Sequence, residues 1–353
     1  MQSDEAKRRL AFGSFYHLAC SHPGRSAVKL LWPELAPAPL VAAMLAFIVL
    51  PASTTASAHA CPSNPLNTTV TFDGSCDFGS ENFLIGNGDG DTGNLTIQNG
   101  GTVSNLIGAV GVRSGSVGTV TVTGTNSAWT NSSDIYVGSD GAGTLIVADG
   151  GTVTSNRGFV GYSSRSDNTV TVTGSDSAWT IAGNLTVGTS GIGALTISGG
   201  GSVSANVGAG TAEIGTEANG VGTLNIGAAV SDSAAGPGTL SAAILNFSAG
   251  SGTLVFNHTA SAYTFNPAIT GGSGVAADIK QIAGTTMLTG DSSGYAGTTT
   301  VSGGSLMVNN MLGSTLSTLT VASGGTLGGT GGVGGAVTVQ SGGTLSPAQA
   351  PAR

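Results

Sequence analysis

Hydrophobic and polar residues alternate with a period of two along most of the chain after residue 60. In Val120-Thr121-Val122-Thr123 valine and threonine take turns, and runs of this kind are separated by Gly, Asn or Asp. Such alternation places apolar side chains on one face of a strand and hydroxyls on the other. Glycine supplies the positive φ that a sharp bend needs. The pattern predicts strands of three to five residues joined by tight corners.

The pattern also repeats after 50 residues. Val120 and Val122 return as Val170 and Val172, while Trp129 and Trp179 occupy the same place in two copies of the tetrapeptide Ser-Ala-Trp-Thr. Each unit holds about six strands, enough for two three-sided coils of about 25 residues. Stacked coils give every strand a neighbour about 4.8 Å away and bury the inward apolar row. The repeat therefore predicts an all-β parallel β-solenoid with these six residues in its core.

Two alternatives accompany this interpretation. A β-propeller also repeats at about 40 to 50 residues, but its strands are longer and three units do not close a ring. The two tryptophans could instead form an exposed stacking surface for carbohydrate, although burial of their large apolar area favours the core.

The repeat length divides the chain into segments. From about residue 252 the strands become bulkier and the period shortens to roughly one coil, as in Val-Ser-Gly-Gly from Val301 and the two Val-x-x-Gly-Gly runs from Val321 and Val339. We expect residues 61–92 to form an N-terminal cap, 93–251 the 50-residue repeats, 252–347 the shorter repeats and 348–353 a tail.

Composition and charge exclude several classes of protein. The 353 residues include 60 Gly, 42 Ser and 44 Thr, with 8% charged residues, which disfavours both helix and disorder. The net charge is −8, and from Cys61 onward five basic residues face fifteen acidic ones. Since a phosphate backbone needs a basic surface, nucleic acid is not an expected partner.

The first 60 residues have the pattern of an extended signal peptide. A basic region precedes an uncharged apolar run, Leu40 to Leu50, which we expect to form the signal helix, and Ala58-His59-Ala60 follows as an A-x-A site. We expect cleavage between Ala60 and Cys61. An uncleaved membrane anchor is the alternative, but eleven apolar residues fall short of the about 20 that span a bilayer.

Cys61 and Cys76 are the two cysteines that follow this leader. In an exported chain an even pair favours a disulfide, here one that closes a loop in the expected cap. Two free thiols, or a lipid on a newly exposed Cys61, are the alternatives.

Candidate chemistry is sparse, and we expect no catalytic residue and no cofactor. His258 is the only histidine after the leader, at a strand end where an outward polar side chain is ordinary. Gly290-Asp-Ser-Ser-Gly294 is similar to the nucleophile motif of chymotrypsin-like proteases, but a turn between strands explains it equally well. Asp89 and Asp91 lie one residue apart among glycines, which makes them a weak calcium candidate that lacks the closing Glu of a full calcium loop.

Two C-terminal runs resemble the passenger-associated transport repeat of Gram-negative autotransporters. The first is residues 284–304, and the second is Gly-Gly-Thr-Leu-Gly-Gly-Thr-Gly-Gly-Val-Gly-Gly-Ala-Val-Thr-Val-Gln-Ser-Gly-Gly-Thr-Leu-Ser-Pro (324–347). The 50-residue units resemble passenger repeats of the same family, so the resemblance covers about residues 93–347. It implies a right-handed parallel β-helix passenger that is exported by its signal peptide. It also implies display at the cell surface through a C-terminal outer-membrane β-barrel.

The sequence printed after Ser346-Pro347 reads Ala-Gln-Ala-Pro-Ala-Arg, where the family continues into a barrel. We therefore expect a truncated gene product, which would be periplasmic or secreted if it ends at Arg353, and surface-displayed in an intact precursor. The expected function is that of a non-enzymatic, adhesin-like monomer with an unknown surface or host ligand. Its expected membrane contact is through the signal peptide or the missing barrel. The alternatives are a polysaccharide-active β-helix enzyme, which would need clustered carboxylates, and a non-functional remnant.

Overall fold

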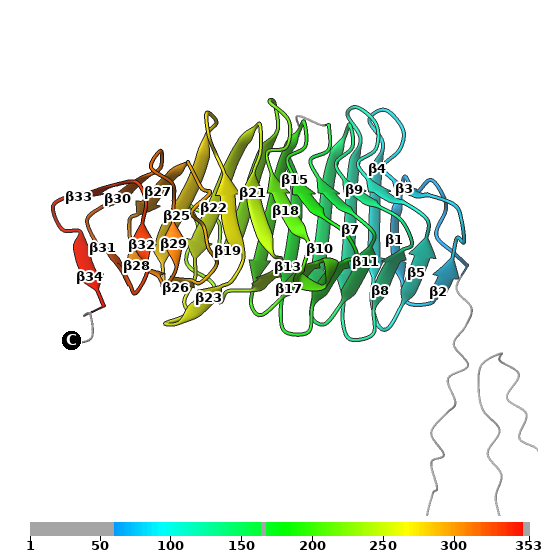
Figure 1. Ribbon diagram of the computed structural model, residues 1–353. Helices are drawn as coiled ribbons and strands as arrows, with labels where there is room; N and C mark the ends of the chain where they lie inside the picture. The colour runs from blue at the N-terminus through cyan, green and yellow to red at the C-terminus, as the bar shows by residue number, and fades with distance from the viewer. Residues whose placement is uncertain (1–59, 164–166, 349–353) are drawn as a thin grey trace, which may run out of the picture. The chain divides into compact units, whose positions relative to one another are not determined.

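The computed structural model describes residues 60–163 and 167–348. The expected signal helix and Ala58 lie outside this part of the chain, as does the tail from residue 349. Within the described residues the chain forms 34 β-strands, β1 to β34, and one 3-10 turn, Asn206–Gly208. Figure 1 shows these strands in coils that follow one another from the N-terminal to the C-terminal end. The expected all-β parallel solenoid is confirmed.

Each coil contributes one strand to each of up to three sheets, whose neighbouring strands pair in parallel. The first sheet contains β1 (Thr69–Phe72), β4 (Thr92–Ile97), β7 (Val117–Thr123), β10 (Ala142–Ala148), β13 (Asp167–Thr173), β16 (Ile192–Ser198), β19 (Val221–Gly227), β22 (Ser251–Asn257), β25 (Ala277–Ala283), β27 (Thr298–Val301), β30 (Thr318–Val321) and β33 (Ala336–Val339). The second contains β2 (Ser75–Asp77), β5 (Thr102–Asn105), β8 (Ala128–Asn131), β11 (Thr152–Ser155), β14 (Ala178–Ile181), β17 (Ser202–Ala205) and β20 (Thr239–Ser241). The third contains β3 (Phe83–Ile85), β6 (Gly108–Val110), β9 (Ile135–Val137), β12 (Gly158–Val160), β15 (Leu185–Val187), β18 (Thr211–Ile214), β21 (Ile244–Phe247) and β24 (Ala268–Gly271).

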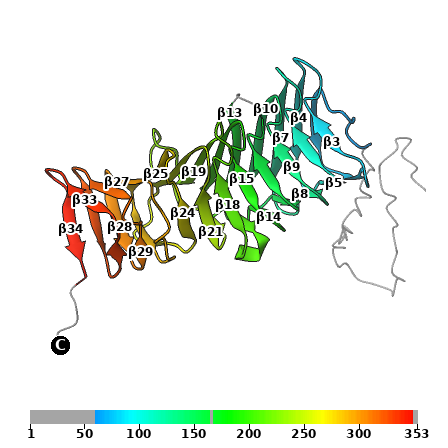
Figure 2. The ribbon, with the colours of Figure 1, turned by 45° about the horizontal axis from the view of Figure 1, so that its top comes forward.

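Past β20 and β24 the second and third sheets give way to two others, while the first sheet continues to the C-terminal end (Figure 2). The fourth contains β23 (Tyr263–Phe265), β26 (Thr285–Leu288), β28 (Gly304–Val308), β31 (Gly325–Gly329) and β34 (Thr344–Pro347). The fifth pairs β29 (Met311–Leu312) with β32 (Gly332–Val333).

The register of the first sheet gives the length of each coil. From β1 to β16, partners in adjacent strands lie 25 positions apart in the sequence, as Thr69 and Asn94 do. The step to β19 is 29 positions, and the step from there to β22 is longer again. From β25 to β27 the step shortens to 20 positions, between the partners Asp278 and Thr298. The coil length expected for the repeats and the shorter C-terminal period are therefore both present.

The first sheet includes strands that are longer than the expected three to five residues. β7, β10, β13 and β16 each span seven, because a glycine or Asn168 lies inside the strand rather than at its end. A β-carbon on Gly143 would lie 2.3 Å from the amide nitrogen of Gly138 and 2.6 Å from the carbonyl oxygen of Val110. The strand passes so close to the preceding corner that there is no room for a β-carbon at Gly143. A glycine that the sequence pattern takes for a corner therefore lies inside a strand.

The core is a continuous row of inward side chains, with burial alternating along strands such as β10. The residues expected there lie within this row: Val120, Val122, Trp129, Val170, Val172 and Trp179. Each indole also donates a hydrogen bond, Trp129 to the side-chain oxygen of Asn105 (2.7 Å) and Trp179 to the hydroxyl of Ser155 (3.1 Å). A buried indole N–H thus has a partner in the preceding coil.

The serine of each Ser-Ala-Trp-Thr tetrapeptide holds a corner of the preceding coil. The Ser127 hydroxyl accepts a hydrogen bond from the amide of Gly100 (3.1 Å), and Ser177 accepts one from Gly150 (3.0 Å). Both glycines have positive φ, 81° and 84°. Each tetrapeptide therefore supplies a core side chain, its tryptophan, and a serine hydroxyl that accepts a hydrogen bond from the amide of a corner glycine.

The segment expected as a cap forms the first coil. β1 pairs with β4 and β2 with β5, and a disulfide joins Cys61 to Cys76 in β2, with their Cα atoms 5.2 Å apart. Among the described residues no helix is long and apolar enough to cross a membrane.

Candidate functional site

Aromatic side chains gather on the outer face of the third sheet. Tyr136 in β9 and Phe159 in β12 are register partners, and both point away from the core between buried neighbours. Their rings stack with centroids 4.9 Å apart and an interplanar angle of 6°. This spacing is close to the distance between adjacent strands, so the stack follows directly from the register.

Tyr162, just beyond β12, completes the group. Its centroid lies 5.2 Å from that of Tyr136 and 5.5 Å from that of Phe159, at interplanar angles of 84° and 81°. Its ring therefore stands across the stacked pair, in contact with both, and the residue is 40% exposed. We call Tyr136, Phe159 and Tyr162 the aromatic cluster.

An ion pair borders the aromatic cluster. Asp134 precedes β9 and Arg157 precedes β12, and the Arg157 guanidinium donates from Nε to Asp134 Oδ1 (3.1 Å) and from Nη2 to Oδ2 (2.6 Å). The Asp134 side chain is 6% exposed and that of Arg157 54%. The guanidinium carbon lies 5.4 Å from the centroid of Phe159, within range of a cation–π contact.

The ion pair shifts the pKa of Arg157 itself and of the neighbouring Tyr136. The hydrogen bond and charge of Asp134 raise the pKa of Arg157, which keeps the guanidinium charged. Partial burial raises the pKa of Tyr136, and the Asp134 carboxylate adds to this effect. The Tyr136 hydroxyl lies 3.4 Å from Asp134 Oδ2. Near neutral pH the site therefore presents the neutral Tyr136 phenol beside a charge-compensated ion pair.

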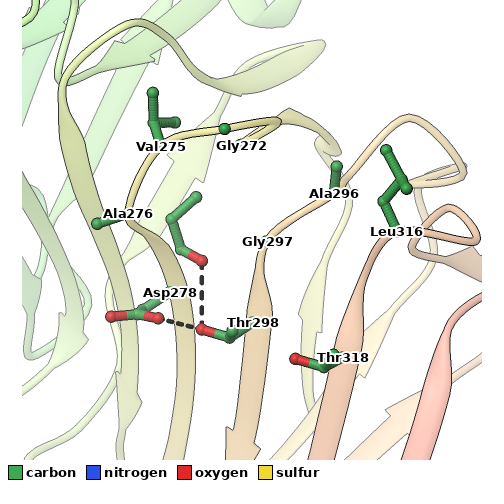
Figure 3. Close-up of a pocket in the computed structure, with 11 residues that line it drawn as sticks. Gly272, Val275, Ala276, Asp278, Ala296, Gly297, Thr298, Leu316 and Thr318 are labelled. Atoms are coloured by element: carbon green, nitrogen blue, oxygen red, sulfur yellow. Dashed lines mark hydrogen bonds between the residues drawn. The ribbon is translucent and has the colours of Figure 1, made fainter.

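A shallow hollow of about 250 Å³ lies beside β25 and β27 (Figure 3). Val275 and Leu316 stand on opposite sides of it, and Asp278 is its ionisable lining residue. The Thr298 hydroxyl donates a hydrogen bond to the Asp278 carboxylate and lies 3.4 Å from the Ala277 carbonyl oxygen. The residues that line the hollow include no histidine, cysteine, lysine or arginine.

His258 does not point outward, and that expectation was wrong. Its side chain is fully buried, with Nε2 2.9 Å from the Thr286 hydroxyl and the ring centroid 5.1 Å from that of Tyr263. Residues 228–238 cover this end of β22, where Ala235 bridges to His258 and the Thr259 amide donates to the Ala235 carbonyl. A register shift between Phe256 and Asn257 also breaks the simple alternation.

This burial predicts a pH dependence of stability. Burial lowers the pKa of His258 below its ordinary value of 6.5, and a backbone hydrogen bond at Ala260 partly opposes the shift. Below about pH 6.5 the unfolded chain therefore binds more protons than the folded chain, so stability falls as the pH drops through that range. Thermal melting at a series of pH values from about 7 to 5 checks this. The His258→Gln variant is expected to lose the slope in this window, and an unchanged slope would mean that another group causes it.

The other sequence candidates have structural partners. The Ser292 hydroxyl is buried and accepts a hydrogen bond from the amide of Ile269 (2.9 Å), while Asp291 accepts one from the amide of Ser293 (3.1 Å). Asp291 thus stabilises a local turn, and Ser292 links that turn to β24. Asp91 accepts a hydrogen bond from the Asn67 amide (2.7 Å), and Asp89 is exposed. No group of three or more His, Cys, Asp or Glu residues in residues 60–163 and 167–348 could hold a metal ion, and calcium at Asp89 and Asp91 stays an untested prediction.

The aromatic cluster was not predicted from the sequence. Asp134 and Arg157 lie 23 positions apart, and the register partners Tyr136 and Phe159 follow the same step. The next step on this sheet, from Phe159 to Thr186, is longer. The spacing between register partners is constant over these coils of the first sheet but varies on the third. A fixed repeat length therefore does not place the two rings opposite each other. The available signal was the charge pattern, since Arg157 is one of five basic residues after the leader.

Comparisons with known proteins match part of the chain to a curated sequence and align much of it with a solved structure. No family model matches the chain. A stretch of 110 residues, 31% of the chain, is 44% identical to the adhesin BmaC autotransporter of Brucella suis biovar 1 (strain 1330). The match spans 3% of that relative's length.

The crystal structure of a TibC-catalysed, hyper-glycosylated TibA fragment aligns with 79% of this chain and 98% of its own, at 17% identity and a TM-score of 0.35. Over the 110 matched residues, the chain is homologous to part of an autotransporter adhesin.

Proposed function

We propose that this chain is a non-enzymatic, adhesive passenger segment of an autotransporter-type protein, exported by its leader and exposed at the cell surface or released. The observation that carries the proposal is the 44% identity over 110 residues to an autotransporter adhesin. The ligand is a molecule of a host or environmental surface, and the solenoid acts as a monomer.

The geometry of the described residues supports contact through an outer face. The hollow beside β25 is shallow and lined chiefly by small residues, whereas the aromatic cluster stands on the outside of the third sheet. A polysaccharide-cleaving site needs two carboxylates on either side of a bond. Asp134 is held by Arg157, and Asp278 is the single carboxylate of the hollow. These features favour adhesion over hydrolysis.

Bead retention tests the proposal. Latex beads coated with the full-length chain are washed over cultured epithelial cells, matrix-coated glass and bare glass, with albumin-coated and heat-unfolded-chain beads as controls. Because many weak contacts on one bead multiply, we expect retention about tenfold or more above both controls on at least one surface. Retention equal to the albumin beads on every surface would contradict an adhesive function.

A further inference from the structure

We propose that the aromatic cluster, together with the Arg157–Asp134 pair, is a binding site for a neutral pyranose glycan. This inference rests on the proposed adhesive function and names the ligand class. The site lies on two successive coils, with Tyr136 and Asp134 beside β9 and Phe159, Arg157 and Tyr162 beside β12.

The flat apolar part of the site is the ring of Tyr162. It stands nearly perpendicular to both stacked rings and nearly equidistant from them, the edge-to-face arrangement that aromatic pairs favour. Tyr162 keeps 40% of its surface exposed beside the stacked pair, so part of its ring is open to a ligand. The negative face of an aromatic ring attracts the partly positive C–H groups on one side of a pyranose ring. Two rings behind Tyr162 fix its orientation before a ligand arrives.

The polar part of the site is the ion pair. Asp134 is almost completely buried and holds the guanidinium through two hydrogen bonds, so the exposed Arg157 head is fixed in place. A planar guanidinium presents five N–H donors, more than these two bonds use. Sugar hydroxyls are acceptors for such donors. The Tyr136 hydroxyl lies on the same side, 3.4 Å from the carboxylate.

The charges of the site and of the whole chain favour an uncharged sugar as the ligand. The Arg157 charge is compensated by Asp134 at 2.6 Å, so this ion pair carries no net positive charge that would attract a uronate, sulfate or phosphate. The chain as a whole carries a net charge of −8, which repels polyanions. A hydroxyl-rich, uncharged ring suits a surface of aromatic faces and fixed polar groups.

The size of the site favours a glycan over a protein. The outward neighbours of the stacked pair in the same register column are Ala109 on one side and Thr186 on the other, both small. The aromatic surface thus ends after two coils. A stable protein interface buries about 800 Å² on each partner around a larger apolar centre, whereas one to three sugar rings need far less.

A glycan microarray probed with the full-length chain tests the inference, followed by titration calorimetry on the strongest neutral oligosaccharide. We expect neutral glycans among the bound probes. The Tyr162→Ala variant is expected to weaken binding about tenfold or more, since it removes the stacking face. Tyr162→Phe keeps the ring and is expected to bind within about threefold of the wild type. Val207→Ala, at an exposed site 89% accessible on the 3-10 turn, is the control and is expected to bind as the wild type does.

Circular dichroism and melting curves establish that each variant is folded, and Tyr162→Leu replaces Tyr162→Ala if the latter is not. Three results would overturn the inference: no glycan bound by the wild type, binding confined to acidic glycans, or equal binding by wild type and Tyr162→Ala. If the wild-type beads adhere while the array is empty, the adhesive function stands and the proposal of a glycan ligand fails. If neither beads nor array respond, both proposals fail.

Discussion

Replacing Gly188 by alanine is expected to lower the free energy of unfolding by about 3 to 5 kcal/mol, one of the two largest effects of a single substitution in this chain. Gly188 forms the corner after β15 with a φ of 75°, a region that costs an L-residue about 1 to 2 kcal/mol. A β-carbon there would also lie 2.4 Å from the carbonyl carbon and oxygen of Val221 in the next coil. Those atoms are backbone and cannot swing aside without disturbing the paired strands β16 and β19.

Gly124→Ala is the matched control. Gly124 also has positive φ, 87°, but the nearest atoms to its β-carbon would be 3.8 Å away, at Asn99 and Ser127. Gly124→Ala therefore has the cost of a positive φ but no steric clash, and its free energy of unfolding should fall by about 1 kcal/mol. Urea unfolding followed by circular dichroism measures both. Equal losses in the two variants would show that close coil-to-coil approach does not constrain the corner.

The second large effect is expected for Trp179→Ala, with a loss of about 3 to 5 kcal/mol. The indole is fully buried in β14 and packs over Gly158 of the preceding coil, where an added β-carbon would lie 2.5 Å from the ring. The substitution removes this apolar volume and the hydrogen bond to the Ser155 hydroxyl. Urea unfolding gives the loss, and Val221→Ala, at a partly exposed position of β19, is the control with an expected change below about 1 kcal/mol.

The pair Trp179 and Gly158 allows a stricter test by a double-mutant cycle. Gly158→Ala is expected to destabilise the wild type because its methyl group would collide with the indole. In the Trp179→Ala background the same methyl group enters the vacated space, so the two losses should fall short of additivity by about 1 kcal/mol or more. Additive losses would mean that the ring does not lie over Gly158.

The core of this solenoid can be predicted from the sequence because the side-chain period of a strand is two. Val120 and Val122 therefore fall on one face without knowledge of the fold, and a repeat of 50 residues carries the same assignment to Val170 and Val172. The strand lengths could not be predicted in the same way. Gly118 and Gly143 resemble corner residues locally, but each lies inside a strand, where the backbone of the preceding corner leaves no room for a β-carbon.

The burial of His258 and the aromatic cluster depend on contacts between distant residues. His258 is covered by residues 228–238, which the lengthened coil between Leu224 and Leu254 supplies. Tyr136 meets Phe159 because the step on the third sheet is shorter at that coil than the step on the first. Both outcomes follow from coil lengths on individual faces, and the alternation pattern contains no information about those lengths.

We propose that adhesion resides in side chains on an outer face of the solenoid, centred on Tyr162. Bead retention with the Tyr162→Ala chain, beside wild-type and Val207→Ala chains, tests that claim most directly. We predict that Tyr162→Ala reduces retention about tenfold or more on the surface where wild-type beads adhere, while Val207→Ala leaves it unchanged. Equal retention by all three folded chains would contradict the claim and place the adhesive surface elsewhere on the solenoid.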